Sequence, residues 1–126
     1  PSRRTIYRFF RDYGAAGVDI SLFALADRLA TEGVQLSQAR WQREVETARV
    51  LCENYWENRT AVIQPPALLN GQSLMEETGL EPGPRLGQAL EAVREAQACG
   101  EVTDRTGAVQ FARRWVEQFH DEQEGD

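Results

Sequence analysis

The basic residues of this chain are its main chemical signal, because all fourteen are arginine. A guanidinium group is planar and suits two-pronged contacts with phosphate or carboxylate. Arg4, Arg8 and Arg11 repeat at intervals of four and three, so they share one face of a helix. Such a stripe could hold an RNA backbone. Alternatively it is a solvated face, or it pairs with acidic groups of another domain. Composition bias of the source genome explains the excess of arginine equally well.

A second candidate site lies at the start of the helix expected from Pro84. Free N–H groups in a first helical turn, such as those of Leu86 and Gly87, carry partial positive charge and can bind phosphate. Arg85 adds a full positive charge, and Gly83 and Gly87 would let a backbone approach closely. The alternative is that both glycines serve tight helix packing and that Arg85 points into water.

Residue combinations that catalyse reactions are not evident. The single histidine forms a His120-Asp121 dipeptide, but a metal site of the HD type needs several His and Asp residues from different helices. Cys52 and Cys99 lie far apart, and we expect buried thiols in a reducing cytoplasm. We therefore expect no catalytic residues, no metal ligands and no cofactor in this chain. Arg113 and Arg114, on the last expected helix, are further candidates for RNA contact.

Helical periodicity covers most of the chain, and no segment alternates like a strand. We therefore expect an all-α, compact bundle of about six helices. Their expected spans are residues 2–13, 19–32, 37–60, 73–78, 84–99 and about 104–120. Asp19 and Ser37 are expected to cap the second and third helices. Ser73 and Glu76, three residues apart, predict a capping box for the fourth.

Two of these helices carry distinctive apolar patterns. The helix of residues 19–32 is apolar almost all round, which predicts a place in the middle of the bundle. Residues 37–60 carry an apolar seam that begins at Trp41 and ends at Tyr55. We expect Trp41, Tyr55 and Trp56 to pack in the core. Trp41 and Trp56 would be able to stack on bases only if their rings were exposed.

Composition and charge narrow the class of protein. A chain of 126 residues with 41% hydrophobic residues is long enough to bury a core. The formal net charge of −6 argues against a generic nucleic-acid binder, which normally has a basic balance. No apolar run approaches the length of a membrane span, and we expect no signal peptide before the first helix. We expect a cytoplasmic protein with no membrane contact.

Glycines and prolines stand at fixed offsets between residues 70 and 102. The run reads Asn70-Gly71-x-x-Leu74-Met75-x-x-x-Gly79-Leu80-x-Pro82-Gly83-Pro84-x-x-Gly87, continued by Glu95-Ala96-Gln97-x-x-Gly100-Glu101-Val102. This run resembles the C-terminal helical region of bacterial tRNA nucleotidyltransferases and poly(A) polymerase-like proteins. In many members that region comes after an HD phosphohydrolase-type domain. The segment Arg8-Phe9-Phe10-Arg11-Asp12-x-Gly14, with Leu25-Ala26-Asp27-x-Leu29-Ala30, is similar to the stretch directly after the HD domain in such proteins.

The resemblance also implies how the chain is organised. The chain begins at Pro1 rather than a methionine, so we expect residues 1–126 to be a single helical domain from the C-terminal part of a longer protein. Within it, residues 1–61 would be helices that come after an HD-type domain. Residues 62–120 would be the nucleotidyltransferase-like C-terminal module, and residues 121–126 an acidic tail that frays.

The resemblance further implies that this part positions RNA, above all tRNA, without being catalytic itself. The family's upstream Gly-Ser and Asp-x-Asp elements have no counterpart here, so Mg²⁺ and ATP or CTP are expected only in an N-terminal domain. Both CCA addition and poly(A) synthesis fit the resemblance. The alternatives are a structural or interaction domain, which packs on the HD domain or pairs two chains, and a relative without nucleotide activity. No oligomeric state is indicated.

Overall fold

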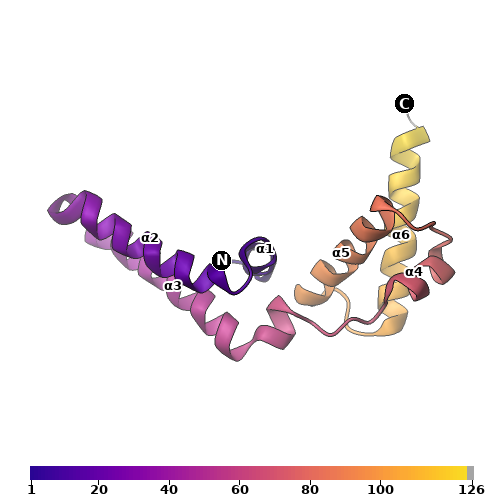
Figure 1. Cartoon of the computed structure of the whole chain (residues 1–126), viewed down its shortest axis with the longest axis horizontal. Helices are drawn as coiled ribbons and strands as arrows, with labels where there is room; N and C mark the ends of the chain where they lie inside the picture. The colour runs from indigo at the N-terminus through magenta and orange to yellow at the C-terminus, as the bar shows by residue number, and fades with distance from the viewer. Residues whose placement is uncertain (125–126) are drawn as a thin grey trace. The chain divides into compact units, whose positions relative to one another are not determined.

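Six α-helices make up most of the computed structural model, which describes the backbone of residues 1–124 and the side chains of residues 1–118 (Figure 1). They are α1 (Arg3–Tyr13), α2 (Ala16–Glu32), α3 (Gln38–Glu57), α4 (Gly71–Thr78), α5 (Pro84–Ala98) and α6 (Arg105–Glu124). A short 3₁₀-helix, η1 (Gly33–Gln35), follows α2, and a π-helix, η2 (Arg59–Ile63), follows α3. The described residues contain no strand, so the prediction of an all-α bundle of about six helices is confirmed.

The chain divides into two compact units, Pro1–Gln64 and Pro65–Asp126. The first unit holds α1, α2 and α3, and the second holds α4, α5 and α6. The boundary lies between Gln64 and Pro65, just after η2, in a stretch where two consecutive prolines exclude regular helix. Each unit has its own apolar core.

Helix α1 packs its apolar face into the core of the first unit. The Ser2 hydroxyl caps the helix by accepting a hydrogen bond from the Thr5 N–H (3.1 Å). Gly14 ends it with a φ of +59°, a conformation that favours glycine. The core comprises Ile6, Phe10, Leu51, Val62 and Ile63.

Helix α2 begins three residues earlier than predicted. Its first residue is Ala16, and Asp19 lies inside the first turn, so the prediction that Asp19 caps the helix is wrong. The turn at Gly14 carries the chain straight from α1 into α2, and Gly17 then lies against the rings of Phe9 and Phe10. Close packing of two helices therefore sets this boundary, and no capping side chain takes part.

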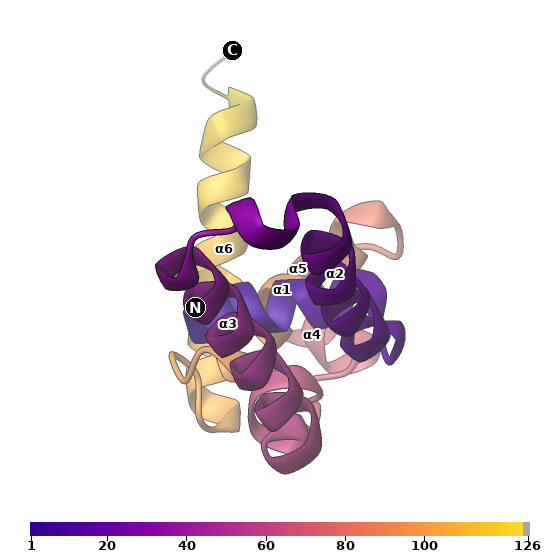
Figure 2. The ribbon, with the colours of Figure 1, turned by 90° about the vertical axis from the view of Figure 1, so that its left-hand side faces the viewer.

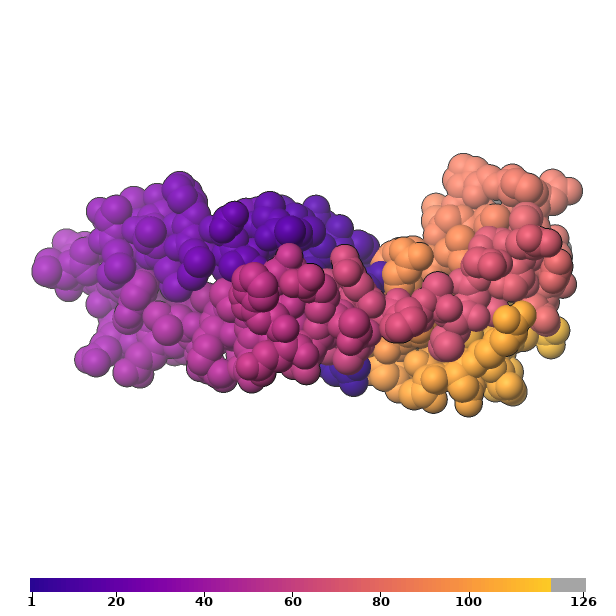
Figure 3. Space-filling view, turned by 60° about the horizontal axis from the view of Figure 1, so that its bottom comes forward, coloured from indigo at the N-terminus to yellow at the C-terminus, as the bar shows by residue number. Residues whose placement is uncertain are grey.

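The prediction that α2 occupies the middle of a bundle is also wrong. Helices α2 and α3 lie side by side (Figures 1 and 2). The buried residues of α2, however, are only Gly17 and Ser21. Large apolar side chains on its other sides are exposed, among them Leu22 (51%), Phe23 (72%) and Leu29 (52%). In the space-filling view the surfaces of α2 and α3 run alongside each other within the first unit (Figure 3). Among the residues that the structure describes, α2 is covered on one side only.

Helix α4 has a capping box that lies upstream of the predicted one. Asn70, not Ser73, is the N-cap: its side chain accepts from the Ser73 N–H (2.8 Å), and the Ser73 hydroxyl accepts from the Asn70 N–H (2.9 Å). The predicted partner Glu76 plays no part in the box. Asparagine is among the strongest N-cap residues, so the helix begins at Gly71, earlier than expected. The predicted end is confirmed, because Gly79 adopts the left-handed conformation.

Helices α5 and α6 complete the second unit. Pro84 is the first residue of α5, as predicted, and Gly100 follows its end with a φ of +80°. Asp104 caps α6 by accepting from the Gly107 N–H (2.7 Å). The core, to which α4 also contributes, comprises Leu69, Leu74, Ala89, Val93, Ala96, Val102, Ala108 and Ala112.

Helix α6 continues to Glu124, beyond the predicted end near residue 120. The last two residues of the predicted acidic tail fall outside the described backbone. Over the described residues, no helix combines the length and the apolar character that crossing a membrane requires.

Candidate nucleic-acid interface

The three arginines of α1 lie away from the buried face of that helix. Arg8 and Arg11 are exposed and Arg4 is half-buried, whereas Ile6 and Phe10 are buried. None of the three arginines is without interactions, and the Arg11 Nε lies 3.1 Å from a carboxylate oxygen of Asp12. The stripe predicted from the spacing is therefore present on α1, and its role as a phosphate contact stays a prediction.

Several other arginines are already paired with carboxylates along α2 and α3. Arg28 Nη2 and Nη1 lie 2.9 Å from Glu44 Oε1 and Glu32 Oε1, respectively. Arg49 pairs with Glu46 (2.6 Å) and also with Glu53. The hydrogen bond to Glu32 is the largest cause that raises the pKa of Arg28 above its ordinary value. These guanidinium groups are engaged within the protein and are poor candidates for phosphate contact.

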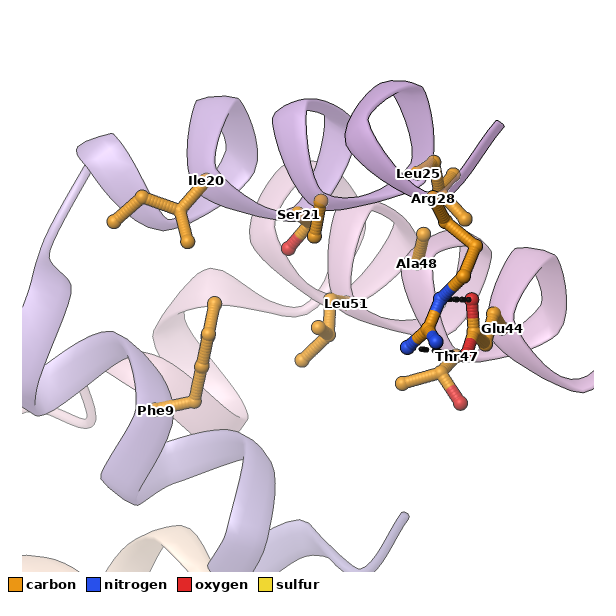
Figure 4. A pocket seen from close by; sticks show the side chains of 10 residues that line it. Phe9, Ile20, Ser21, Leu25, Arg28, Glu44, Thr47, Ala48 and Leu51 are labelled. Atoms are coloured by element: carbon orange, nitrogen blue, oxygen red, sulfur yellow. Dashed lines mark hydrogen bonds and ion pairs between the residues drawn. The ribbon is translucent and has the colours of Figure 1, made fainter. Parts of the chain in front are cut away.

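The Arg28–Glu44 pair closes one end of a pocket between α2 and α3 (Figure 4). The pocket has a volume of about 290 Å³ and its remaining wall is mostly apolar, with Phe9 and Ile20 at the opposite end from the ion pair. Ser21 does not offer its hydroxyl proton to a ligand, because the hydroxyl donates to the Gly17 carbonyl (2.8 Å). The pocket is therefore apolar with a neutralised polar end, which does not suit a phosphate.

The Pro84 helix start differs from its predicted geometry in one respect. The Gly87 N–H donates to the Gly83 carbonyl (3.4 Å), so Gly87 is not one of the free donors. The N–H of Leu86 is the last one in the first turn of α5 that has no acceptor within the helix. A Cβ on Gly87 would meet nothing within 4 Å, so tight packing is not the reason for this glycine. Two guanidinium nitrogens of Arg85, Nε and Nη2, are buried from solvent. Arg85 therefore does not simply point into water, and its role as a phosphate ligand stays a prediction.

The two arginines predicted on α6 differ in whether a carboxylate pairs with them. Arg113 Nη2 lies 2.9 Å from Glu77 Oε2, and its Nε donates to the Glu77 carbonyl (3.1 Å), so this side chain ties α6 to α4. Arg114 is exposed and lines a small groove with Phe111 and Trp115. No carboxylate in the described part of the chain pairs with Arg114.

Charge is divided unequally between the two units. Pro1–Gln64 holds nine arginines against eight carboxylates, a formal charge of +1. Pro65–Asp126 holds five arginines against twelve carboxylates, a formal charge of −7. The overall charge of −6 therefore conceals a near-neutral first unit. Because phosphate contacts need a favourable local potential, the first unit would oppose an anionic ligand less than the second unit.

Two aromatic residues near the end of α3, Tyr55 and Trp56, are both predicted to lie in the core. Tyr55 does pack against the core, but Trp56 is 70% exposed, so the prediction of a buried Trp56 is wrong. The guanidinium carbon of Arg59 lies 4.1 Å from the Tyr55 ring centroid and 5.9 Å from that of Trp56. Trp56 follows the last position of the apolar seam and precedes the polar pair Glu57 and Asn58. This position at the polar end of the seam is the sequence signal that Trp56 is exposed. The sequence analysis does not include Arg59 among the candidate residues.

Groups that could hold a metal do not gather in the described part of the chain. No three His, Cys, Asp or Glu residues come together there as a metal site requires. The His120-Asp121 dipeptide lies outside the described side chains. Cys52 and Cys99 are half-buried, and neither forms a disulfide.

Comparison with known proteins adds two relatives. The A-adding tRNA nucleotidyltransferase of Deinococcus radiodurans is 40% identical over 101 residues, which cover 79% of this chain and 22% of the relative. The CC-adding tRNA nucleotidyltransferase of Thermus thermophilus is 34% identical over 113 residues, which cover 90% of this chain and 24% of the relative. The chain resembles a fragment of a tRNA nucleotidyltransferase.

The chain spans about a quarter of the length of these two tRNA nucleotidyltransferases. The resemblance is therefore to one part of such an enzyme, and extends over most of this chain. No family model matches the chain. No solved structure matches it either.

Proposed function

We propose that this chain is a non-catalytic, tRNA-positioning part of a tRNA nucleotidyltransferase or of a poly(A) polymerase-like enzyme. The observation that carries the proposal is the identity of 34–40% with two enzymes that are both named tRNA nucleotidyltransferases. The proposal assigns the chemistry, with Mg²⁺ and ATP or CTP, to another part of the longer enzyme. It also includes an HD phosphohydrolase-type domain as a neighbour of this part in the same chain.

The proposed mechanism is recognition of the RNA backbone by arginines of the first unit. The stripe of Arg4, Arg8 and Arg11 would follow phosphates along the outer face of α1, since Arg binds phosphate with two prongs. Arg43 is exposed and has no carboxylate partner among the described residues, so it is available for the same task. The near-neutral charge of this unit supports the proposal, because it opposes phosphate less than the acidic second unit does.

Binding of tRNA at several salt concentrations tests this function. We expect the 126-residue chain to bind tRNA with an affinity that falls steeply as salt rises, because bound phosphates release counterions. Arg8→Gln should weaken binding and flatten the dependence of log affinity on log salt by about one unit. Arg94→Gln is the matched control, since Arg94 is exposed in the acidic second unit and also has no carboxylate partner in the described region. If the chain does not bind tRNA, the proposed function is wrong.

The variant Arg85→Glu tests separately whether the start of α5 binds phosphate. If Arg85 contacts phosphate, reversal of its charge should weaken tRNA binding more than Arg94→Gln does. An unchanged affinity would mean that the start of α5 binds no phosphate, while the function assigned to the first unit remains.

A structural or interaction role is the second candidate, and the exposed side of α2 favours it. Leu22, Phe23 and Leu29 present apolar surface of the kind that marks contacts with other protein. This role predicts no tRNA binding at any salt concentration. A relative without nucleotide activity remains the third alternative.

A further inference from the structure

An exposed tryptophan and an arginine lie together where α3 ends. Trp56 is 70% exposed, and the Arg59 guanidinium carbon lies near two ring centroids, those of Tyr55 (4.1 Å) and Trp56 (5.9 Å). The Arg59 Nε donates to the Tyr55 carbonyl (3.1 Å). The backbone and rings at the end of α3 therefore hold Arg59, and no carboxylate in the described part of the chain neutralises it.

The aromatic rings beneath these two side chains continue into the core of the first unit. The Tyr55 ring stacks on that of Phe10, with 5.4 Å between centroids and 29° between planes, and Phe10 is 3% exposed. Trp56 meets Tyr55 edge-on, with 5.2 Å between centroids and 86° between planes. Because the rings that hold Trp56 are anchored in the core, an incoming ligand has little side-chain freedom to freeze.

We propose that Trp56, with Arg59 beside it, is a stacking platform for an unpaired base of RNA. Every base has a π-face, so an exposed indole can stack on it with little regard to sequence. The fixed guanidinium supplies positive charge next to the stacked base, where the phosphates of the same strand must pass. The platform deepens the proposed function and rests on it for the class of ligand.

Local charge favours RNA over a protein partner at this position. Arg59 has no carboxylate partner among the described residues, and Glu53, one turn before Trp56, is ion-paired with Arg49, which it shares with Glu46. Glu57 is the carboxylate next to Trp56 in sequence, and salt largely screens a single exposed charge. A protein-docking patch would be expected to surround the indole with apolar side chains, whereas charged residues flank it here.

The test is the affinity of the 126-residue chain for a labelled, unstructured RNA of about ten nucleotides, which is within the usual footprint of single-strand binding. A second probe has the same sugar-phosphate backbone and length but lacks the bases. The variants are Trp56→Ala and Trp56→Leu, of which the second keeps apolar bulk and loses the aromatic face. Phe23→Ala is the matched control. Phe23 is an aromatic residue of the same unit with similar exposure (72%), and no arginine of the described part of the chain lies over its ring.

We expect both Trp56 variants to bind the RNA about tenfold more weakly than the parent chain. Phe23→Ala should leave the affinity unchanged, and the probe without bases should bind the parent and Trp56→Ala equally. Circular dichroism checks the fold of each variant, and Trp56→Leu decides the outcome if Trp56→Ala does not fold. The platform is overturned if both Trp56 variants bind like the parent, or if Phe23→Ala loses as much.

Two further outcomes separate the platform from the proposed function. If the parent binds tRNA with a steep salt dependence while Trp56→Ala binds as well as the parent, the platform fails and the proposed function stands. If the parent binds neither tRNA nor the short RNA, both fail. Full retention of affinity by Trp56→Leu alone would assign the indole to apolar contact, as in a protein interface, and would also overturn the platform.

Discussion

Gly17 lies so close to Phe9 that a Cβ atom added to the glycine would be 2.8 Å from Cε1 of the ring. It would also be 3.0 Å from two atoms of the Phe10 ring. Gly17 is buried in the first turn of α2, and Phe10 belongs to the core. The glycine is therefore the point at which α1 and α2 come together.

Gly17→Ala should destabilise the first unit. Overpacking typically costs about 1–3 kcal/mol, which exceeds the gain of up to about 1 kcal/mol in helix propensity. We expect a net loss of about 1–2 kcal/mol, measured by urea unfolding. An unchanged midpoint would mean that the two rings move aside at no cost.

Gly87→Ala should raise the free energy of unfolding, whereas Gly17→Ala should lower it. Gly87 lies in α5 at an exposed position, and a Cβ there meets no atom within 4 Å. Alanine should therefore stabilise the helix by up to about 1 kcal/mol. Urea unfolding measures the gain. Binding of tRNA by the same variant shows whether the glycine is needed for close approach of a backbone, in which case affinity falls although stability rises.

These two glycines show where sequence reasoning succeeds and fails. Helix ends that are marked by glycine or proline are predicted correctly, as at Gly14, Gly79 and Pro84. A positive φ or a missing N–H acts locally, so the sequence reveals it. The role of Gly17 depends on rings from another helix, so no local rule reveals it. For the same reason the start of α2 was wrongly assigned to Asp19.

Apolar patterns revealed which residues are hydrophobic but not whether a neighbour covers them. Ala48 and Leu51, which lie between Trp41 and Tyr55 on α3, are buried, yet Trp56 and much of α2 are exposed. Periodicity reports only the faces of one helix, and covering a face requires a second element. The prediction of the candidate site is affected most, because it assigns Trp56 to the core and does not include Arg59 among the site residues.

Asn70→Ala should destabilise α4 by about 0.5–2 kcal/mol, because the Ser73 N–H loses its acceptor. Glu76→Ala is the matched control and should change stability by less than about 0.5 kcal/mol, since Glu76 lies outside the capping box. Thermal unfolding of both variants measures the difference. A larger effect of Glu76→Ala would restore the capping box that the sequence suggested.

Acid should break the ion pair between Glu46 and Arg49. The hydrogen bond from Arg49 is the largest cause that lowers the pKa of Glu46 from its ordinary 4.5. A carboxyl whose pKa is lower in the folded than in the unfolded chain stabilises the fold above the unfolded pKa, and this contribution disappears as pH falls through the folded pKa. We expect NMR titration of the Glu46 carboxyl to show the lowered pKa, and Arg49→Gln to return it toward 4.5. Equal pKa values in the parent and in the variant would contradict the pairing.

The uncovered side of α2 has a practical consequence for anyone who purifies this chain. A fluorescent dye such as ANS reports apolar surface that water can reach, and it ordinarily brightens only when a protein loosens. Phe23, Leu22 and Leu29 already offer such surface in the folded state. Dye-based melting curves should therefore start bright and rise little, and circular dichroism will be the more faithful record of unfolding.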